Sequence, residues 1–252
     1  MVASNQHRGP TLTADLSIAA FALALPTIVT LLYFICLAGT KAAKQVVYLI
    51  GKTVQFTAPI VWTYLTRPDA LLLSMPDGRG VLPGLAFGAL VAAAMFVVYW
   101  FWLKPAGLFA GAVQDAIVGK LRTFGFAKLG PYAGLSVFYC GAHSLLEEYY
   151  WRWFVFALLA EHLPLGAAIA ISSLGFMAHH VVLLGVYFGW KSPATYVFST
   201  GVAIGGAFWA WLLSHSGSLA GPWISHLLID AAIFAIGYDL LRDALRNNAK
   251  AE

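Results

Sequence analysis

Long apolar stretches are the feature of this chain that most restricts its fold. A helix that crosses a bilayer needs about 20 mostly apolar residues. Seven stretches approach that length, at about 16–37, 46–65, 82–103, 132–160, 165–188, 196–213 and 219–240. Of all residues, 60% are hydrophobic and 10% are charged, whereas about a quarter of the residues of a soluble domain are charged. The sequence therefore predicts an all-α fold, a polytopic transmembrane helical bundle with about seven spans.

The stretch 107–125 differs from the seven apolar ones. Its apolar residues recur at helical spacing, but it also carries Asp115, Lys120 and Arg122. Such a mixture is typical of an amphipathic helix that lies in the membrane interface. The alternative is that this stretch crosses as well, which would make eight spans.

Basic residues in the connecting segments predict the orientation of the spans, because cytoplasmic loops collect Lys and Arg. With seven crossings, Arg8, Arg67 and Arg79 lie on one side. The other side collects Lys41, Lys44, Lys104, Lys120, Arg122, Lys128, Lys191, Arg242, Arg246 and Lys250. We therefore expect a multi-pass membrane protein with a cytoplasmic C-terminus. The membrane we expect is a bacterial inner membrane, although the charge bias does not itself indicate the source. The net charge of +4 is spread over loops and tail, so it indicates topology and not a nucleic-acid partner.

Charged residues interrupt the apolar stretch 135–159. Glu147 and Glu148 are adjacent, and Arg152 follows Glu148 by four residues, so Glu148 and Arg152 share a helix face and can pair. Intramembrane charges are costly and usually mark a functional site. One base for two acids leaves Glu147 available for general-base work on water. A purely structural ion network is the alternative. His143, one turn before Glu147, either donates to it or is a core histidine, and we favour the second interpretation.

Two later apolar segments carry further polar residues. Phe176 and His180 share one helix face, and His179 points elsewhere. His226 and Asp230 are also one turn apart, an arrangement that suits an acid that orients an imidazole or a pair that holds an oxyanion. Each pattern alone is common in helices. Their order and their intramembrane location make them informative together.

This series resembles the CPBP intramembrane proteases, which include the type II CAAX prenyl endopeptidases, bacteriocin-processing proteins and sorting-tag proteases. The motifs are Glu147-Glu148-x-x-x-Arg152, Phe176-x-x-x-His180 and His226-x-x-x-Asp230. The resemblance covers about 135–235 and implies a catalytic four-helix core at 131–240. N-terminal transmembrane helices and the interfacial helix would precede it at 1–130, and a cytoplasmic tail would follow at 241–252.

The resemblance implies a peptide hydrolase of the glutamic type. Glu147 and His180 would activate water, Glu148 and Arg152 would position them, and His226 would stabilise the oxyanion. The expected substrate is a protein or peptide with a C-terminal membrane segment, tag or lipid. A non-catalytic immunity or scaffold protein of the same fold is the alternative.

Asp230 stands where many relatives have Asn. An ionised aspartate only accepts hydrogen bonds, so Asp230 is either protonated or orients His226. The resemblance assigns no role to His179.

Two further questions remain open at the level of sequence. Lys52, in the second apolar stretch, either lines a polar cavity and meets a substrate carboxylate, or extends toward the interface. No cofactor is expected. A zinc-dependent hydrolase is nevertheless an alternative, because Glu147, His180 and His226 form a plausible set of two histidines and one carboxylate.

Overall fold

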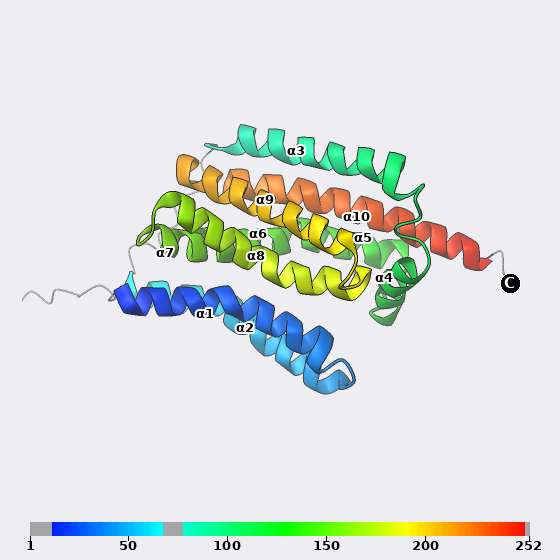
Figure 1. Ribbon diagram of the computed structural model, residues 1–252, viewed down its shortest axis with the longest axis horizontal. Coiled ribbons are helices and arrows are strands. Elements are labelled where there is room, and N and C mark those ends of the chain that lie inside the picture. Colours follow the sequence, from blue (N-terminus) through cyan, green and yellow to red (C-terminus); the bar gives the residue numbers. More distant parts are fainter. Residues whose placement is uncertain (1–11, 68–77, 250–252) are drawn as a thin grey trace, which may run out of the picture.

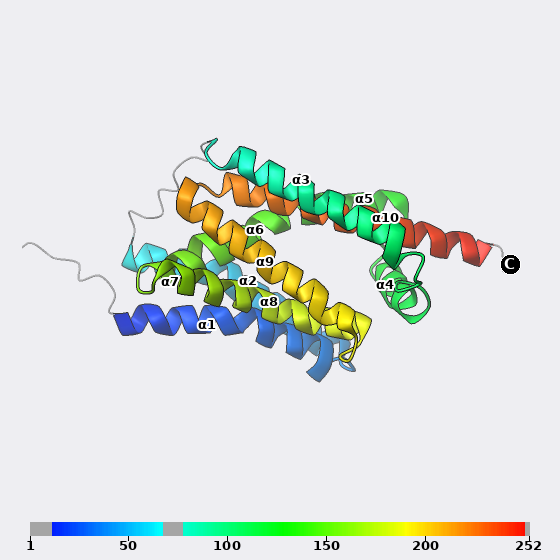
Figure 2. The ribbon, with the colours of Figure 1, turned by 45° about the horizontal axis from the view of Figure 1, so that its top comes forward.

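The computed structural model describes residues 12–67 and 78–249, and all regular structure within these residues is helical. The long helices are α1 (Leu12–Leu31), α2 (Lys41–Thr66), α3 (Val81–Val98), α8 (Leu165–Phe188), α9 (Pro193–Ser216) and α10 (Ala220–Ala249). They run lengthwise through one bundle (Figure 1). The α1–α2 pair lies on one side and the α3–α10 pair on the other, with α8 and α9 between them (Figure 2). The predicted all-α class is thus confirmed for the described residues.

The fourth predicted span, at 132–160, is a continuous helical run that contains two π-helical segments. It comprises α5 (Leu129–Val137), the π-helix η4 (Phe138–His143), α6 (Ser144–Glu148), the π-helix η5 (Tyr149–Phe156) and α7 (Ala157–Ala160). A π turn is wider than an α turn and frequently occurs at functional sites. Here two π segments enclose the five residues that end in the two glutamates.

Among residues 12–67 and 78–249, five helices are long and apolar enough to cross a membrane. They are Leu12–Cys36, which includes the π-helix η1 (Leu32–Cys36), Val81–Leu103, which includes η3 (Tyr99–Leu103), Leu165–Phe188, Pro193–Ser216 and Ala220–Arg246. The other two predicted spans are α2, which carries Lys52, and the run with α6, which carries Glu147, Glu148 and Arg152. The total of seven therefore stays a prediction.

The stretch predicted to lie in the interface contains a short helix, α4 (Ala112–Thr123). Its 12 residues extend about 18 Å at 1.5 Å per residue, less than the roughly 30 Å of a hydrocarbon core. It lies toward the same end of the bundle as the C-terminus (Figure 1). At that end α10 continues to Ala249, so residues 241–249 of the predicted tail extend the last helix.

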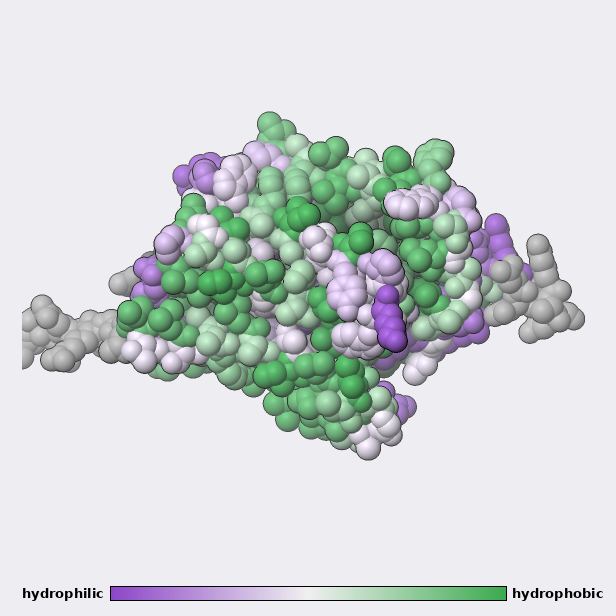
Figure 3. Space-filling model, viewed as in Figure 1, coloured by the Kyte–Doolittle hydropathy of each residue, from purple (hydrophilic) through white to green (hydrophobic). Residues whose placement is uncertain are grey.

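The outside of the bundle is apolar. Leu82, Phe101 and Val137 are 76%, 82% and 74% exposed. Figure 3 shows a mostly hydrophobic face, with hydrophilic residues gathered toward the two ends. Exposed apolar surface of this extent marks contact with a partner or a membrane. Together with the five apolar helices, it identifies an integral membrane protein.

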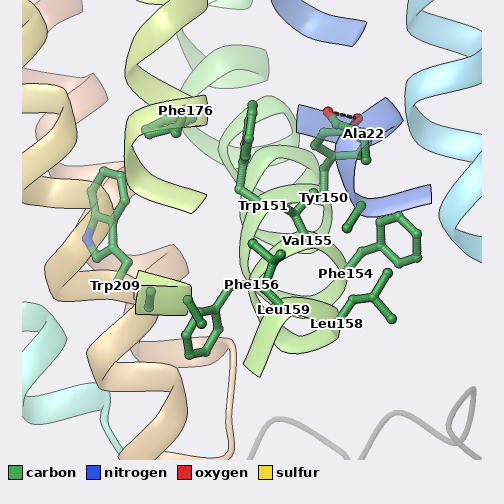
Figure 4. Packing of buried hydrophobic residues seen from close by; sticks show 13 residues of the cluster. Ala22, Tyr150, Trp151, Phe154, Val155, Phe156, Leu158, Leu159, Phe176 and Trp209 are labelled. Atoms are coloured by element: carbon green, nitrogen blue, oxygen red, sulfur yellow. Dashed lines mark hydrogen bonds between the residues drawn. The ribbon is translucent and has the colours of Figure 1, made fainter. Parts of the chain in front are cut away.

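The buried core centres on η5. Trp151 and Val155 are fully buried, and Tyr150 donates a hydrogen bond to the Ala22 carbonyl of α1 at 2.7 Å. Phe176 of α8 and Trp209 of α9 pack around the same helix (Figure 4). The helix that carries the glutamates is therefore held from three sides.

Glycine allows α3 to lie unusually close to α10. A Cβ atom added at Gly84 would come within 2.2 Å of the Gly221 carbonyl oxygen, and one at Gly88 within 2.9 Å of Ser225 Cα. Small residues at this four-residue spacing permit backbone contact between membrane helices. The contact fixes the position of α10 and with it that of the polar residues it carries.

Ion clusters tie the ends of the bundle together. At one end, Arg67 donates to Asp15 at 2.7 Å and to Glu161 at 2.9 Å. At the other end, Asp239 accepts from Tyr99 at 2.8 Å and pairs with Lys104. Burial lowers the pKa of Lys104, but its hydrogen bonds to the carboxylates of Asp239 and Asp243 outweigh that effect and hold this pKa above its ordinary value.

Candidate active site

Glu147 lies at the centre of a group of imidazoles. It is 6% exposed and sits in α6, between the two π segments. Its Oε1 is 4.0 Å from Nε2 of His143, one turn earlier, and 4.0 Å from Nε2 of His179 in α8. Its Oε2 is 3.7 Å from Nε2 of His226 in α10. Three histidines from three helical segments thus surround one buried carboxylate.

His226 is held by contacts on its ring and on both nitrogens. Its Nδ1 is 2.8 Å from Glu148 Oε1. The ring of Trp209 stacks on it at 4.3 Å and 16°, and Trp209 Nε1 in turn donates to Ser225 Oγ at 2.9 Å. Asp230 Oδ1 is 3.8 Å from His226 Nε2. These contacts aim Nε2 of the imidazole at Glu147.

Arg152 is a buried cation that pairs with Glu148, the carboxylate that holds His226. Its Nη1 is 3.2 Å from Glu148 Oε1, and the two side chains are 2% and 0% exposed. The guanidinium carbon lies 4.5 Å from the Phe176 ring centre and 4.7 Å from that of Trp209. Gly206 of α9 leaves room for it, because a Cβ there would be 3.1 Å from Nη2. The predicted pairing of Glu148 with Arg152 is present.

The two adjacent histidines of α8 have different surroundings. His180 Nδ1 is 2.9 Å from the Phe176 carbonyl oxygen, so Nδ1 is the donor and Nε2 is left as an acceptor. His180 interacts electrostatically with Glu147, but His179 is the one whose Nε2 comes to 4.0 Å of that carboxylate. His179 also stacks on Trp151, with ring centres 5.7 Å apart and planes 4° apart.

The structure thus brings together the seven motif residues and three side chains that belong to no motif. Helical spacing alone placed His143 on the Glu147 face, although its sequence context favoured a core histidine. His179 has no sequence signal beyond its position next to His180. Trp209 has none, since only the packing of α9 against α10 puts its ring on His226. Glu148 contacts His226 and Arg152. The positioning of Glu147 and His180 by Glu148 and Arg152, which the resemblance implies, stays a prediction.

A metal ion needs donor atoms that converge. Within residues 12–67 and 78–249, the one set of three such donors inside 4.8 Å of one another is Asp15, Glu161 and His162. Arg67 already bridges the two acids of that set, so it is an ion cluster. The donor atoms of Glu147, His180 and His226 are spread more widely, whereas zinc binds such atoms at about 2.0–2.2 Å.

The separations around Glu147 suit acid–base chemistry. Distances of 3.7–4.0 Å exceed a direct hydrogen bond and suit polar atoms bridged by a water molecule. A buried carboxylate beside imidazoles can take a proton from such a water. Donors fixed in a site of low dielectric stabilise developing negative charge well.

Comparison with known proteins bears on the same residues. Neither the curated proteins nor the solved structures include a significant match to the chain. One family model does match, over residues 130–232, and it describes the type II CAAX prenyl endopeptidase Rce1-like family. The matched segment contains Glu147, Arg152, His180, His226 and Asp230 and excludes Lys52. Over residues 130–232 the chain therefore matches the Rce1-like CAAX endopeptidases, which confirms the resemblance to the CPBP membrane proteases.

Proposed function

We propose that the protein is an intramembrane endopeptidase that hydrolyses a peptide bond near the C-terminus of a membrane-tethered or tagged protein. The observation that carries the proposal is the buried Glu147 carboxylate, with imidazoles from three helical segments within 4.0 Å. The family match to a group of endopeptidases supports it. The positions of the basic residues support a cytoplasmic C-terminus, and the membrane we propose is a bacterial inner membrane.

In the proposed reaction, Glu147 takes a proton from water while the oxygen of that water attacks the scissile carbonyl carbon. His180, with Nε2 as a free acceptor, orients the water. The proton then passes to the leaving amine nitrogen as the carbon–nitrogen bond breaks. No metal ion is needed for this sequence of steps.

His226 stabilises the oxyanion in this scheme. Since Nδ1 donates to Glu148, Nε2 can donate only when the ring is protonated on both nitrogens. Three carboxylates lie within 4.0 Å of the ring, those of Glu148, Glu147 and Asp230, and they favour that charged form. Asp230 thus acts by supporting the imidazolium of His226, and Arg152 fixes Glu148.

The test is cleavage of an internally quenched peptide that ends in farnesylated Cys-Val-Ile-Met, with the full-length protein in nanodiscs. Glu147→Gln should lower the cleavage rate by about 10²–10⁴-fold, the usual contribution of a general base. Glu161→Gln is the matched control, since Glu161 is exposed and bonds Arg67 at the bundle end. Thermal unfolding should show that both variants are folded. Unchanged cleavage by folded Glu147→Gln would disprove the proposal.

The same assay separates the alternatives. Loss of cleavage with a chelator, restored by zinc, would establish the zinc-dependent form with Glu147, His180 and His226 as ligands. A wild-type protein that cleaves neither this peptide nor a peptide with an unlipidated apolar C-terminus would be a scaffold of the same fold.

A further inference from the structure

Lys52 is a half-buried cation in α2 whose hydrogen-bond partner is a neutral side chain. Its Nζ donates to Gln55 Oε1 at 3.1 Å and lies 5.4 Å from the Phe56 ring centre. Within the described residues, no carboxylate oxygen lies within the 4.0 Å that defines an ion pair with it. Gln55, which is 2% exposed, is neutral, so its hydrogen bond with Lys52 does not neutralise the ammonium charge.

The direction of the side chain argues against extension toward the interface. Lys52 lies between the ends of α2 at Lys41 and Thr66, and the Lys41 end is the nearer one. An interfacial lysine extends its ammonium toward the nearest water. Lys52 Nζ instead bonds Gln55, three residues toward the farther end.

The charge of Lys52 acts on the candidate active site. It interacts electrostatically with Glu147, and also with His143, His179 and His180. Lys44, two turns earlier on α2, instead lies over the Tyr33 ring at 5.7 Å. Lys52 is one turn before Phe56, whose carbonyl oxygen accepts a hydrogen bond from Tyr149 Oη at 3.2 Å, so α2 packs on the helical run that carries Glu147. A cation on this part of α2 that is not bonded to Glu147 suits an anion that arrives with the substrate.

We propose that Lys52 binds the C-terminal carboxylate of the peptide being cut, with Gln55 holding the ammonium in place. This assignment rests on the proposed function and deepens it. In a peptide whose scissile carbonyl lies at Glu147 and whose carboxylate lies at Lys52, the number of residues between the two is fixed by the separation of these side chains, since an extended residue spans about 3.3–3.6 Å. The enzyme would therefore prefer a free C-terminus and release a fragment of fixed length.

The test is binding of a product-like peptide, which does not depend on hydrolysis. Trileucine and trileucine amide are titrated against the full-length protein in nanodiscs by isothermal calorimetry. The wild type should bind the acid at least tenfold more tightly than the amide. Lys52→Met should reduce binding of the acid to that of the amide and leave the amide unchanged. Lys52→Arg should keep the preference, and Lys44→Met is the matched control.

Three results would overturn the assignment: no binding of trileucine, equal binding of acid and amide by the wild type, or equal weakening of both by Lys52→Met. The last would show a structural role. Cleavage of the farnesylated peptide by wild type but not by Glu147→Gln, together with any of these results, would leave the proposed function standing without the carboxylate site. If the wild type binds the acid more tightly than the amide but Glu147→Gln cleaves as fast as the wild type, the carboxylate site would stand and the proposed role of Glu147 would fall.

Discussion

The pair of Glu148 and Arg152 offers a quantitative test of how the site is held together. The two side chains are 0% and 2% exposed and meet at 3.2 Å, so neither charge is screened by solvent as a surface pair would be. Arg152→Met removes the cation and keeps a long apolar stem between the Phe176 and Trp209 rings. Glu148 is then left as a buried carboxylate whose one remaining charged partner is His226.

The expected loss of unfolding free energy follows from a general difference between two kinds of substitution. Removing one partner of a buried ion pair is costly, whereas replacing both partners can be nearly neutral. Removal of one partner from a buried ion pair typically destabilises a protein by about 3–5 kcal/mol, because the other charge is left uncompensated. Glu148→Gln in the same protein removes that orphaned charge, and the amide oxygen still accepts from His226 Nδ1. We expect the double variant to be about 2 kcal/mol more stable than Arg152→Met alone, within the usual range for coupled neighbours.

Unfolding free energies from SDS titration in mixed micelles, followed by fluorescence of the 9 tryptophans, would measure both values. Arg246→Met, at an exposed position of α10, is the control and should cost less than about 0.5 kcal/mol. A cost below about 1 kcal/mol for Arg152→Met, or strictly additive single costs, would refute the view that Arg152 neutralises a buried acid.

Two further predictions concern the bundle. Gly84→Leu should separate α3 from α10 and lower the melting temperature by at least several degrees, because even a Cβ at this position lies 2.2 Å from the Gly221 carbonyl oxygen; an unchanged melting temperature would contradict the close contact. Asp15→Asn should cost about 1.5–3 kcal/mol, since it weakens a charged hydrogen bond to Arg67. Asp115→Asn, an exposed change in α4, is its control, and equal effects of the two changes would show that the cluster at Arg67 contributes nothing.

The family and the main reactive groups can be read from the sequence because they depend on local spacing. Glu148 and Arg152 pair across one turn, as their four-residue separation predicts. The continuous apolar runs likewise predict the long helices, and the bounds 165–188 of one stretch coincide with α8. The scarcity of charged residues also predicts the apolar outer surface of the bundle.

Partners that come from different helices could not be predicted in this way. Spacing within a helix says nothing about which residue of α8 approaches Glu147, and the histidine at 4.0 Å is His179, which the motif does not include. Glu148 holds His226 because α10 packs beside α6. The wide turns of η4 and η5 also shift the faces of their helix from those of a regular α-helix, and nothing in the residue pattern signals them.

The sequence by itself determined that this chain forms apolar helices and that a few costly charges lie inside them, because hydropathy and helical period are local properties. Only the tertiary structure decided which imidazoles surround Glu147 and which carboxylate orients His226. Those choices depend on how neighbouring helices pack, and packing is set by contacts such as those at Gly84, Gly206 and Trp209 between segments far apart in the chain.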